Sequence, residues 1–208
     1  MKRFVSAICI ASVLAIATPF AHAIPITYTA ILGGSAEEPP VASPGTGQAT
    51  VVYDSVARTL EIQTSFADLV GTTTVAHIHC CTATPSSGLA GVATQVPSFT
   101  GFPVGVSSGN YSNVFDLTDP ASWNPSFVAG NGGTPASAEM ALAAGLADAR
   151  AYLNIHTSFA PGGEIRGFLV ETSSIPEPAT LALIGTALLG LAFSAATAPG
   201  RARRLRAP

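Results

Sequence analysis

The sequence predicts an all-β fold of antiparallel strands with one short helix, followed by a C-terminal transmembrane helix. Stretches such as Ile26–Leu32 and Thr59–Phe66 alternate apolar and polar residues, the period-two pattern of a strand with two different faces. Only 10% of the 208 residues are charged, while 20 are Gly and 16 are Pro. This composition favours strands and turns over long helices. The uncharged run Ala179–Ala198 predicts the membrane helix.

The first 23 residues have the three parts of a secretory signal peptide. Lys2 and Arg3 give a positively charged start, Phe4–Ala17 is apolar, and Ala21–Ala23 provides an A-x-A cleavage site. The mature chain is therefore expected to begin near Ile24, in an exported protein.

Residues 24–173 form the expected globular domain, and their charge argues against a nucleic-acid partner. They contain three basic residues, Arg58, Arg150 and Arg166, against eleven Asp and Glu residues, which gives a net charge of −8. Nucleic-acid binding depends on basic residues that neutralise phosphates. The other basic residues lie in the two terminal segments.

The first half of the domain contains the clearest strand patterns. Gly33–Gly47 is rich in Gly, Pro and Ser, so we expect a loop in which Glu37 and Glu38 are solvated. Further strands are expected at Gly47–Asp54, Thr74–Cys81 and Val114–Leu117.

The second half is less regular. Thr82–Gly109 is dense in turn residues and is expected to form loops and short strands. Asp119–Gly133 is expected to be a loop that Trp123 and Phe127 anchor in the core. Alanine-rich Ala136–Arg150 is the one expected helix.

A hairpin, Ala151–Gly167, closes the domain. Its first strand alternates Tyr152, Asn154 and His156 with Leu153 and Ile155, and the turn is Pro161-Gly162-Gly163. Glu164 and Arg166 are two residues apart, so they project to the same face of the second strand. This spacing predicts a partly buried ion pair that clamps the hairpin.

Two sequence segments resemble the CHRD domain, the module named after chordin. They are the closing segment NIHTSFAPGGEIRG and the early SAEEPPV (residues 35–41), which has Glu in place of the usual Gln and Pro in place of the usual Val. The resemblance implies an immunoglobulin-like or dismutase-like β-sandwich. It also implies a structural or binding module of the cell envelope or extracellular matrix. No nucleophile, phosphate-loop or paired-carboxylate motif is visible, so we do not expect an enzyme.

Three histidines form the candidate metal site. His77 and His79 are two apart on one expected strand, and His156 lies at the end of another. Imidazoles on one face suit Cu or Zn, which would make the domain a metal-dependent redox or sensing protein. The metal site is the alternative here, and we expect three structural histidines that only form hydrogen bonds across the sheet.

Cys80 and Cys81 follow the histidine pair. By alternation Cys81 is expected on the histidine face and Cys80 on the opposite face. Adjacent cysteines can close an eight-membered disulfide ring, pair between chains, remain thiols, or act as small buried hydrophobic residues.

The C-terminal segment, residues 174–208, resembles the PEP-CTERM sorting signal. The triad Pro176-Glu177-Pro178 precedes the apolar run Ala179–Ala198, and four arginines follow Gly200 and are expected on the cytoplasmic side. The resemblance implies an exosortase as processing enzyme and a membrane anchor before processing. It then implies a cell-surface or extracellular location, with extracellular polysaccharide or envelope proteins as candidate partners.

Overall fold

A computed structural model describes residues 24–172 of the chain. The predicted signal peptide, the triad at residues 176–178 and the predicted membrane helix at residues 179–198 lie outside these residues. Within residues 24–172, no helix is both long and apolar enough to cross a membrane.

Eight strands and four short helices make up the described part of the chain. The strands are β1 (Ile26–Gly33), β2 (Thr46–Asp54), β3 (Thr59–Ala67), β4 (Thr73–Cys80), β5 (Gly109–Asp116), β6 (Ala151–Thr157), β7 (Ile165–Phe168) and β8 (Val170–Glu171). The helices are the 3-10 turns η1 (Gly34–Ala36) and η2 (Pro120–Ser122), and the α-helices α1 (Pro125–Gly130) and α2 (Pro135–Ala147).

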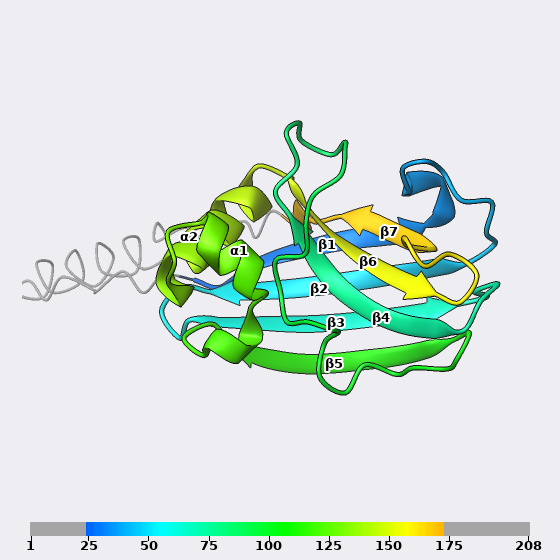
Figure 1. Ribbon diagram of the computed structural model, residues 1–208, viewed down its shortest axis with the longest axis horizontal. Coiled ribbons are helices and arrows are strands. Elements are labelled where there is room, and N and C mark those ends of the chain that lie inside the picture. Colours follow the sequence, from blue (N-terminus) through cyan, green and yellow to red (C-terminus); the bar gives the residue numbers. More distant parts are fainter. Residues whose placement is uncertain (1–23, 173–208) are drawn as a thin grey trace, which may run out of the picture.

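All the strand pairs are antiparallel and belong to one sheet, which curls (Figure 1). The strand order is β4-β6-β7-β1-β2-β3-β5, and β8 also pairs with β1. The two ends of the sheet approach each other through the segment that precedes β5. There the Phe99 amide donates to the Ala76 carbonyl of β4, and the Phe99 ring stacks on Tyr111 of β5 at 5.7 Å between centroids. The all-β prediction is confirmed. The single sheet curls until its two ends face each other, as the two layers of a sandwich do.

The core fills the inside of the curl. The inward residues of β2 and β3, such as Val51, Leu60 and Ile62, are fully buried. Helices α1 and α2 lie together at one end of the sheet (Figure 1), where Leu142 and Leu146 of α2 join the core. Burial of such side chains contributes about 1.5–3 kcal/mol each.

The predicted helix at residues 136–150 is present but ends earlier, at Ala147. Thr134 caps its start through the Ser137 amide, and Pro135 occupies the first turn. Ala149 has a positive φ of 53°, so the chain turns out of the helix in time to enter β6.

The expectation of a loop over residues 119–133 was wrong in part, because η2 and α1 lie there. Each begins with a polar cap followed by proline: the Asp119 side chain accepts from the Ala121 amide, and the Asn124 side chain from the Ser126 amide. The two predicted anchors are confirmed, because both Trp123 and Phe127 are buried.

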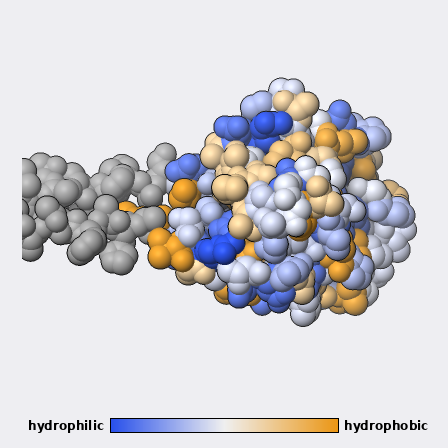
Figure 2. Space-filling model, turned by 60° about the vertical axis from the view of Figure 1, so that its left-hand side comes forward, coloured by the Kyte–Doolittle hydropathy of each residue, from blue (hydrophilic) through white to orange (hydrophobic). Residues whose placement is uncertain are grey.

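The outside of the molecule offers no single broad apolar region on the face shown in Figure 2. Hydrophobic residues there form separate patches among neutral and hydrophilic ones. Scattered exposed apolar residues of this kind are ordinary for a globular surface.

Candidate metal centre

Strands β4 and β6 place all three histidines on one face of the sheet. In the register of this pair His77 lies opposite Asn154, and His79 lies opposite Tyr152. His156, two residues beyond Asn154, projects to the same face. The alternate residues on the other face belong to the hydrophobic core, so the period-two pattern separates a polar face from an apolar one.

The three imidazoles surround one point. Their ring centroids are 5.4 Å (His77 to His156), 5.8 Å (His77 to His79) and 5.8 Å (His79 to His156) apart. One nitrogen from each ring lies within 4.8 Å of the others. Ligands at ~2.0–2.1 Å from a tetrahedral ion are roughly 3.3 Å apart, so a small inward movement of the rings would let them share one ion.

Backbone carbonyls hold the other nitrogen of each ring. The three pairs are His77 Nε2 with Pro97 O at 2.6 Å, His79 Nδ1 with Ala90 O at 2.9 Å, and His156 Nδ1 with Pro161 O at 2.9 Å. Because a carbonyl oxygen can only accept, each of these nitrogens carries the hydrogen. The lone pair of each neutral ring is therefore on the remaining nitrogen: Nδ1 of His77, and Nε2 of His79 and His156.

Burial keeps these imidazoles neutral at pH 7. It lowers the pKa of His79 to about 4, and it lowers the pKa of His77 and His156 below their usual value as well. The carbonyl hydrogen bonds oppose this effect without reversing it. A neutral imidazole is the form that binds a metal ion.

Five buried polar side-chain atoms in residues 24–172 have no hydrogen-bond partner, and three of them are the second ring nitrogens of the histidines. They are Glu37 Oε1, His77 Nδ1, His79 Nε2, Asn154 Oδ1 and His156 Nε2. Each unsatisfied buried group costs about 1–3 kcal/mol. Such groups therefore call for a specific explanation, of which an ion is one.

The predicted Glu164–Arg166 ion pair does not form, which corrects the sequence-based expectation. Glu164 is fully buried and accepts four hydrogen bonds, from the Val70 and Gly71 amides and the Ser43 and Thr157 hydroxyls, at 2.5–3.0 Å. Burial raises the pKa of Glu164, but these bonds outweigh burial and hold it below its usual value. Glu164 precedes β7, so strand alternation does not fix its direction.

Arg166 forms a different clamp. Its guanidinium donates to the Ala36 and Gly88 carbonyls. It lies 3.8 Å from Glu37 and 3.5 Å from Glu38, measured from guanidinium nitrogen to carboxylate oxygen. The expectation that Glu37 is solvated was wrong, since only 7% of it is exposed. Burial raises the pKa of Glu37 to about 7, although Arg166 acts to lower it.

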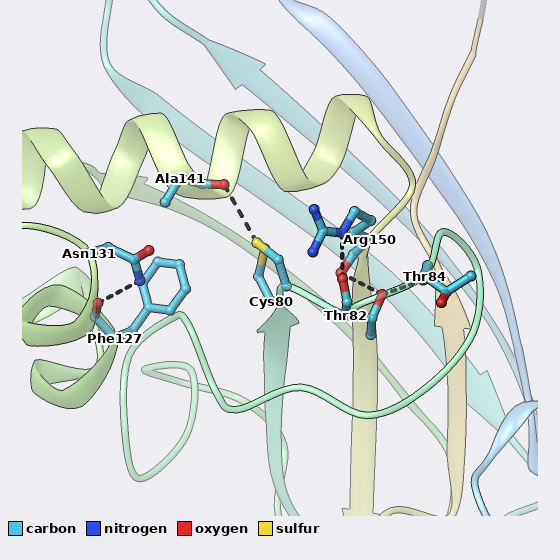
Figure 3. Close-up of a disulfide and its surroundings, with 8 residues drawn as sticks. Cys80, Thr82, Thr84, Phe127, Asn131, Ala141 and Arg150 are labelled. Atoms are coloured by element: carbon cyan, nitrogen blue, oxygen red, sulfur yellow. Dashed lines mark hydrogen bonds between the residues drawn. A yellow bond between two sulfur atoms is a disulfide. The ribbon is translucent and has the colours of Figure 1, made fainter.

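Cys80 and Cys81 are joined in a disulfide (Figure 3). The expectation that Cys81 shares the histidine face was wrong, because β4 ends at Cys80 and the alternation ends with it. The Cys81 sulfur instead faces the Ala141 carbonyl of α2 at 3.5 Å. A side chain at Gly145 would collide with both sulfur atoms, so α2 can pack here only with glycine.

The structure adds two residues to this site that the sequence did not single out. The alternation of β6 predicts that Asn154 and His156 share one face, but alternation alone does not indicate what the Asn154 amide contacts. Glu37 comes from the loop after β1, more than one hundred residues before Asn154 and His156 in the chain. The prolines around Glu37 give no indication in the sequence that its side chain is buried.

Fold and site together define an all-β domain with a buried polar face that converges on three neutral imidazoles. Residues 28–169 match the family model of the CHRD domain, and residues 174–195 match that of the PEP-CTERM protein-sorting motif. The chain belongs to the CHRD domain family, and the sorting motif marks it as an exported protein that is membrane-anchored before an exosortase processes it. Searches of curated proteins and of solved structures gave no match.

Proposed function

We propose that the exported domain binds one divalent metal ion, Cu²⁺ or Zn²⁺, through His77 Nδ1, His79 Nε2 and His156 Nε2. The observation that carries this proposal is that three buried imidazoles surround one point, and that each is held by a backbone carbonyl and has one nitrogen without a partner. Fixing the second nitrogen of a histidine in this way is the usual support for a metal ligand.

The donor set also predicts the order of affinities. A site of imidazole nitrogens follows the general divalent order, so Cu²⁺ should bind more tightly than Zn²⁺. A site of this kind serves a redox or sensing role if copper occupies it, and a non-redox role if zinc does.

The test is metal analysis and titration of the purified protein with its disulfide intact and any free thiols alkylated. We expect one equivalent of Cu²⁺ per chain. His77→Ala and His156→Ala should each weaken binding at least tenfold. Gln63→Ala, on the exposed outer face of β3, is the matched control and should have no effect. Binding weaker than about 100 μM, which corresponds to only ~5.5 kcal/mol, would reject the metal site.

A second candidate function, a binding module for neutral polysaccharide, rests on a different surface. Strands β2, β3 and β5 present two rows of uncharged side chains, Gln48–Ser65–Asn110 and Thr50–Gln63–Ser112, on their outer face. These rows line a shallow hollow of about 420 Å³. Hydroxyl and amide groups suit a neutral sugar chain, because they donate and accept without charge.

This second candidate needs its own test. Sedimentation with dextran and with the extracellular polysaccharide of the host should show binding that Gln63→Ala and Asn110→Ala weaken together. His77→Ala should leave it unchanged. Binding that responds to His77 and not to Gln63 would contradict this assignment.

Processing by the exosortase fixes the final location in this proposal. The recognised element is Pro176-Glu177-Pro178, and cleavage releases the domain to the cell surface or the medium. Glu177→Ala should leave the apolar run intact, so full-length protein should accumulate in the membrane. Mass spectrometry of extracellular material measures this. An intact C-terminus in wild-type extracellular protein would contradict it.

A further inference from the structure

The polar face next to the three histidines holds two further unsatisfied groups, and both are acceptors. Asn154 Oδ1 and Glu37 Oε1 are buried without a donor. Only 2% of Asn154 and 7% of Glu37 is exposed. Within residues 24–172 neither atom has a hydrogen-bond partner, although the Asn154 amide lies near enough to Glu37 to act against the rise of its pKa. A buried acceptor of this kind needs a donor.

Asn154 borders the point on which the histidines converge. It lies opposite His77 in the β4–β6 register and two residues before His156 on the same face. In an antiparallel pair, residues directly opposite have Cβ atoms about 4.5–5.5 Å apart. The line from His79 to His156 crosses the strand pair diagonally, so it passes between His77 and Asn154. Asn154 therefore occupies the side of the centre that His77 leaves open.

Glu37 meets Asn154 over a glycine. A Cβ placed on Gly163 would lie 2.5 Å from the Asn154 amide and 2.8 Å from Glu37 Oε1. Gly163 has a φ of +132°, a conformation that side-chain-bearing residues rarely adopt. Only glycine fits at this position, and its bare backbone lets the Asn154 amide and Glu37 Oε1 pack close together.

The remaining contacts hold Glu37 in this orientation. Its other carboxylate oxygen faces Arg166 Nε at 3.8 Å. Arg166 in turn lies opposite Asn154 in the β6–β7 register and stacks 4.7 Å from the centre of the Tyr152 ring. The row His77–Asn154–Arg166 thus runs across three strands, with Glu37 packed against it from the β1–β2 connection.

We infer that a metal ion held by the three histidines keeps a fourth position for water or another small proton-donating ligand, which Asn154 and Glu37 hold by accepting its hydrogens. The inference rests on the proposed metal site. A water molecule has two hydrogens to donate and a lone pair for the ion, which matches two acceptors beside an incomplete set of three ligands. Three protein ligands plus water is also the arrangement of reactive rather than structural zinc sites.

The same acceptors determine which ligands the fourth position prefers. Glu37 brings a carboxylate to this position, so a small anion such as azide would meet like charge there. Neutral ligands that carry hydrogens, such as water or a hydroperoxide, are the favoured class. The histidines are at most 9% exposed, so only small molecules reach the ion.

Two measurements on the copper-loaded protein at pH 8 test this inference. The first is the relaxation rate of solvent protons, which an exchanging water on Cu²⁺ should raise clearly above that of the zinc-loaded protein. The second is azide affinity, followed by its charge-transfer absorption. Glu37→Gln replaces an acceptor by an amide that can donate, so it should tighten azide binding about tenfold.

Glu38→Gln is the matched control. It removes the same charge from the same loop and from the same Arg166 partner, but 53% of the Glu38 side chain is exposed. It should change azide affinity less than twofold. Thermal melting of both variants checks that each is folded, and the solvent relaxation experiment needs no variant.

The outcomes separate the two proposals. Wild-type protein that binds no copper would overturn the metal site and this inference with it. Copper binding without enhanced solvent relaxation would overturn the inference alone, because it indicates a closed site in which a protein group is the fourth ligand. Equal azide responses of Glu37→Gln and Glu38→Gln would do the same.

Discussion

The two ends of the curled sheet differ in whether their polar side chains are exposed to solvent or buried. On β2, β3 and β5 the alternate polar residues, such as Gln48, Gln63 and Ser112, face solvent. On β6 every residue is buried, including Asn154 and His156. Both regions have the same period-two pattern, and the difference lies in what covers them.

Loops cover the polar face of β4, β6 and β7. Carbonyls from residues 90, 97 and 161 close over the histidines, and the loop that carries Glu37 closes over Arg166. A buried polar face is costly unless its groups are paired. This fold buries such a face and leaves five atoms unpaired on it, and the proposed metal ion would satisfy three of them. The exposed face carries no such cost, because water satisfies it.

Glu164→Ala should give the largest effect on stability. It would leave two backbone amides and two hydroxyls without their acceptor at the edge of the buried region. We expect the free energy of unfolding to fall by about 3–5 kcal/mol, as for breaking other buried charged networks. Urea denaturation measures this. Glu61→Ala, on β3 of the open region, is the control and should cost less than about 0.5 kcal/mol.

Metal loading should stabilise the buried region and not the open one. At a free Cu²⁺ concentration one hundred times the dissociation constant, the stability of the protein should rise by about 2.7 kcal/mol. Hydrogen exchange should slow locally for the amides of β4 and β6. If the protection of β2 and β3 rose equally in native conditions, the two regions would not differ in the way proposed here.

Acid should weaken the buried region through its neutral histidines. The pKa of His79 falls from its ordinary 6.5 to about 4 on folding, so the stability associated with it is complete above pH 6.5 and is lost as the pH falls towards 4. For His79 alone the loss between pH 7 and pH 5 is about 2 kcal/mol. Glu37 has a raised pKa and works in the opposite direction over this range.

Glu37→Gln removes that opposing contribution. The variant should therefore lose about 2 kcal/mol or more between pH 7 and pH 5 in urea denaturation without metal, and wild type should lose less. Wild type and variant with identical pH profiles would show that Glu37 does not titrate as a buried acid.

The smallest effect is expected on the open face. Gln63→Ala removes a side chain whose amide bonds only to Glu61, and solvent can replace that bond. The change in stability should stay within about 0.5 kcal/mol. A loss above 1 kcal/mol in thermal or urea denaturation would indicate that something covers this face as well.

Local patterns were enough for much of the fold. The alternation of β1, β2, β3, β4 and β6 located these strands to within a few residues, because a strand needs one face for the core. Residue spacing also put His77 and His79 on one face. The two short helices that begin at Pro120 and Pro125 were missed although their cap-plus-proline signals were present.

Composition, hydropathy and alternation are properties of neighbouring residues, so they were enough to predict an exported all-β domain, a sorting segment and a same-face histidine pair. The three-dimensional arrangement was needed to show that His156 completes the cluster and that Cys81 turns towards α2. It was also needed to show that Arg166 pairs with Glu37 and Glu38 rather than with Glu164. These contacts join residues far apart in the chain. The pairing of β4 with β6 and the closure of the loops set them, and no local spacing encodes which buried group will meet which partner.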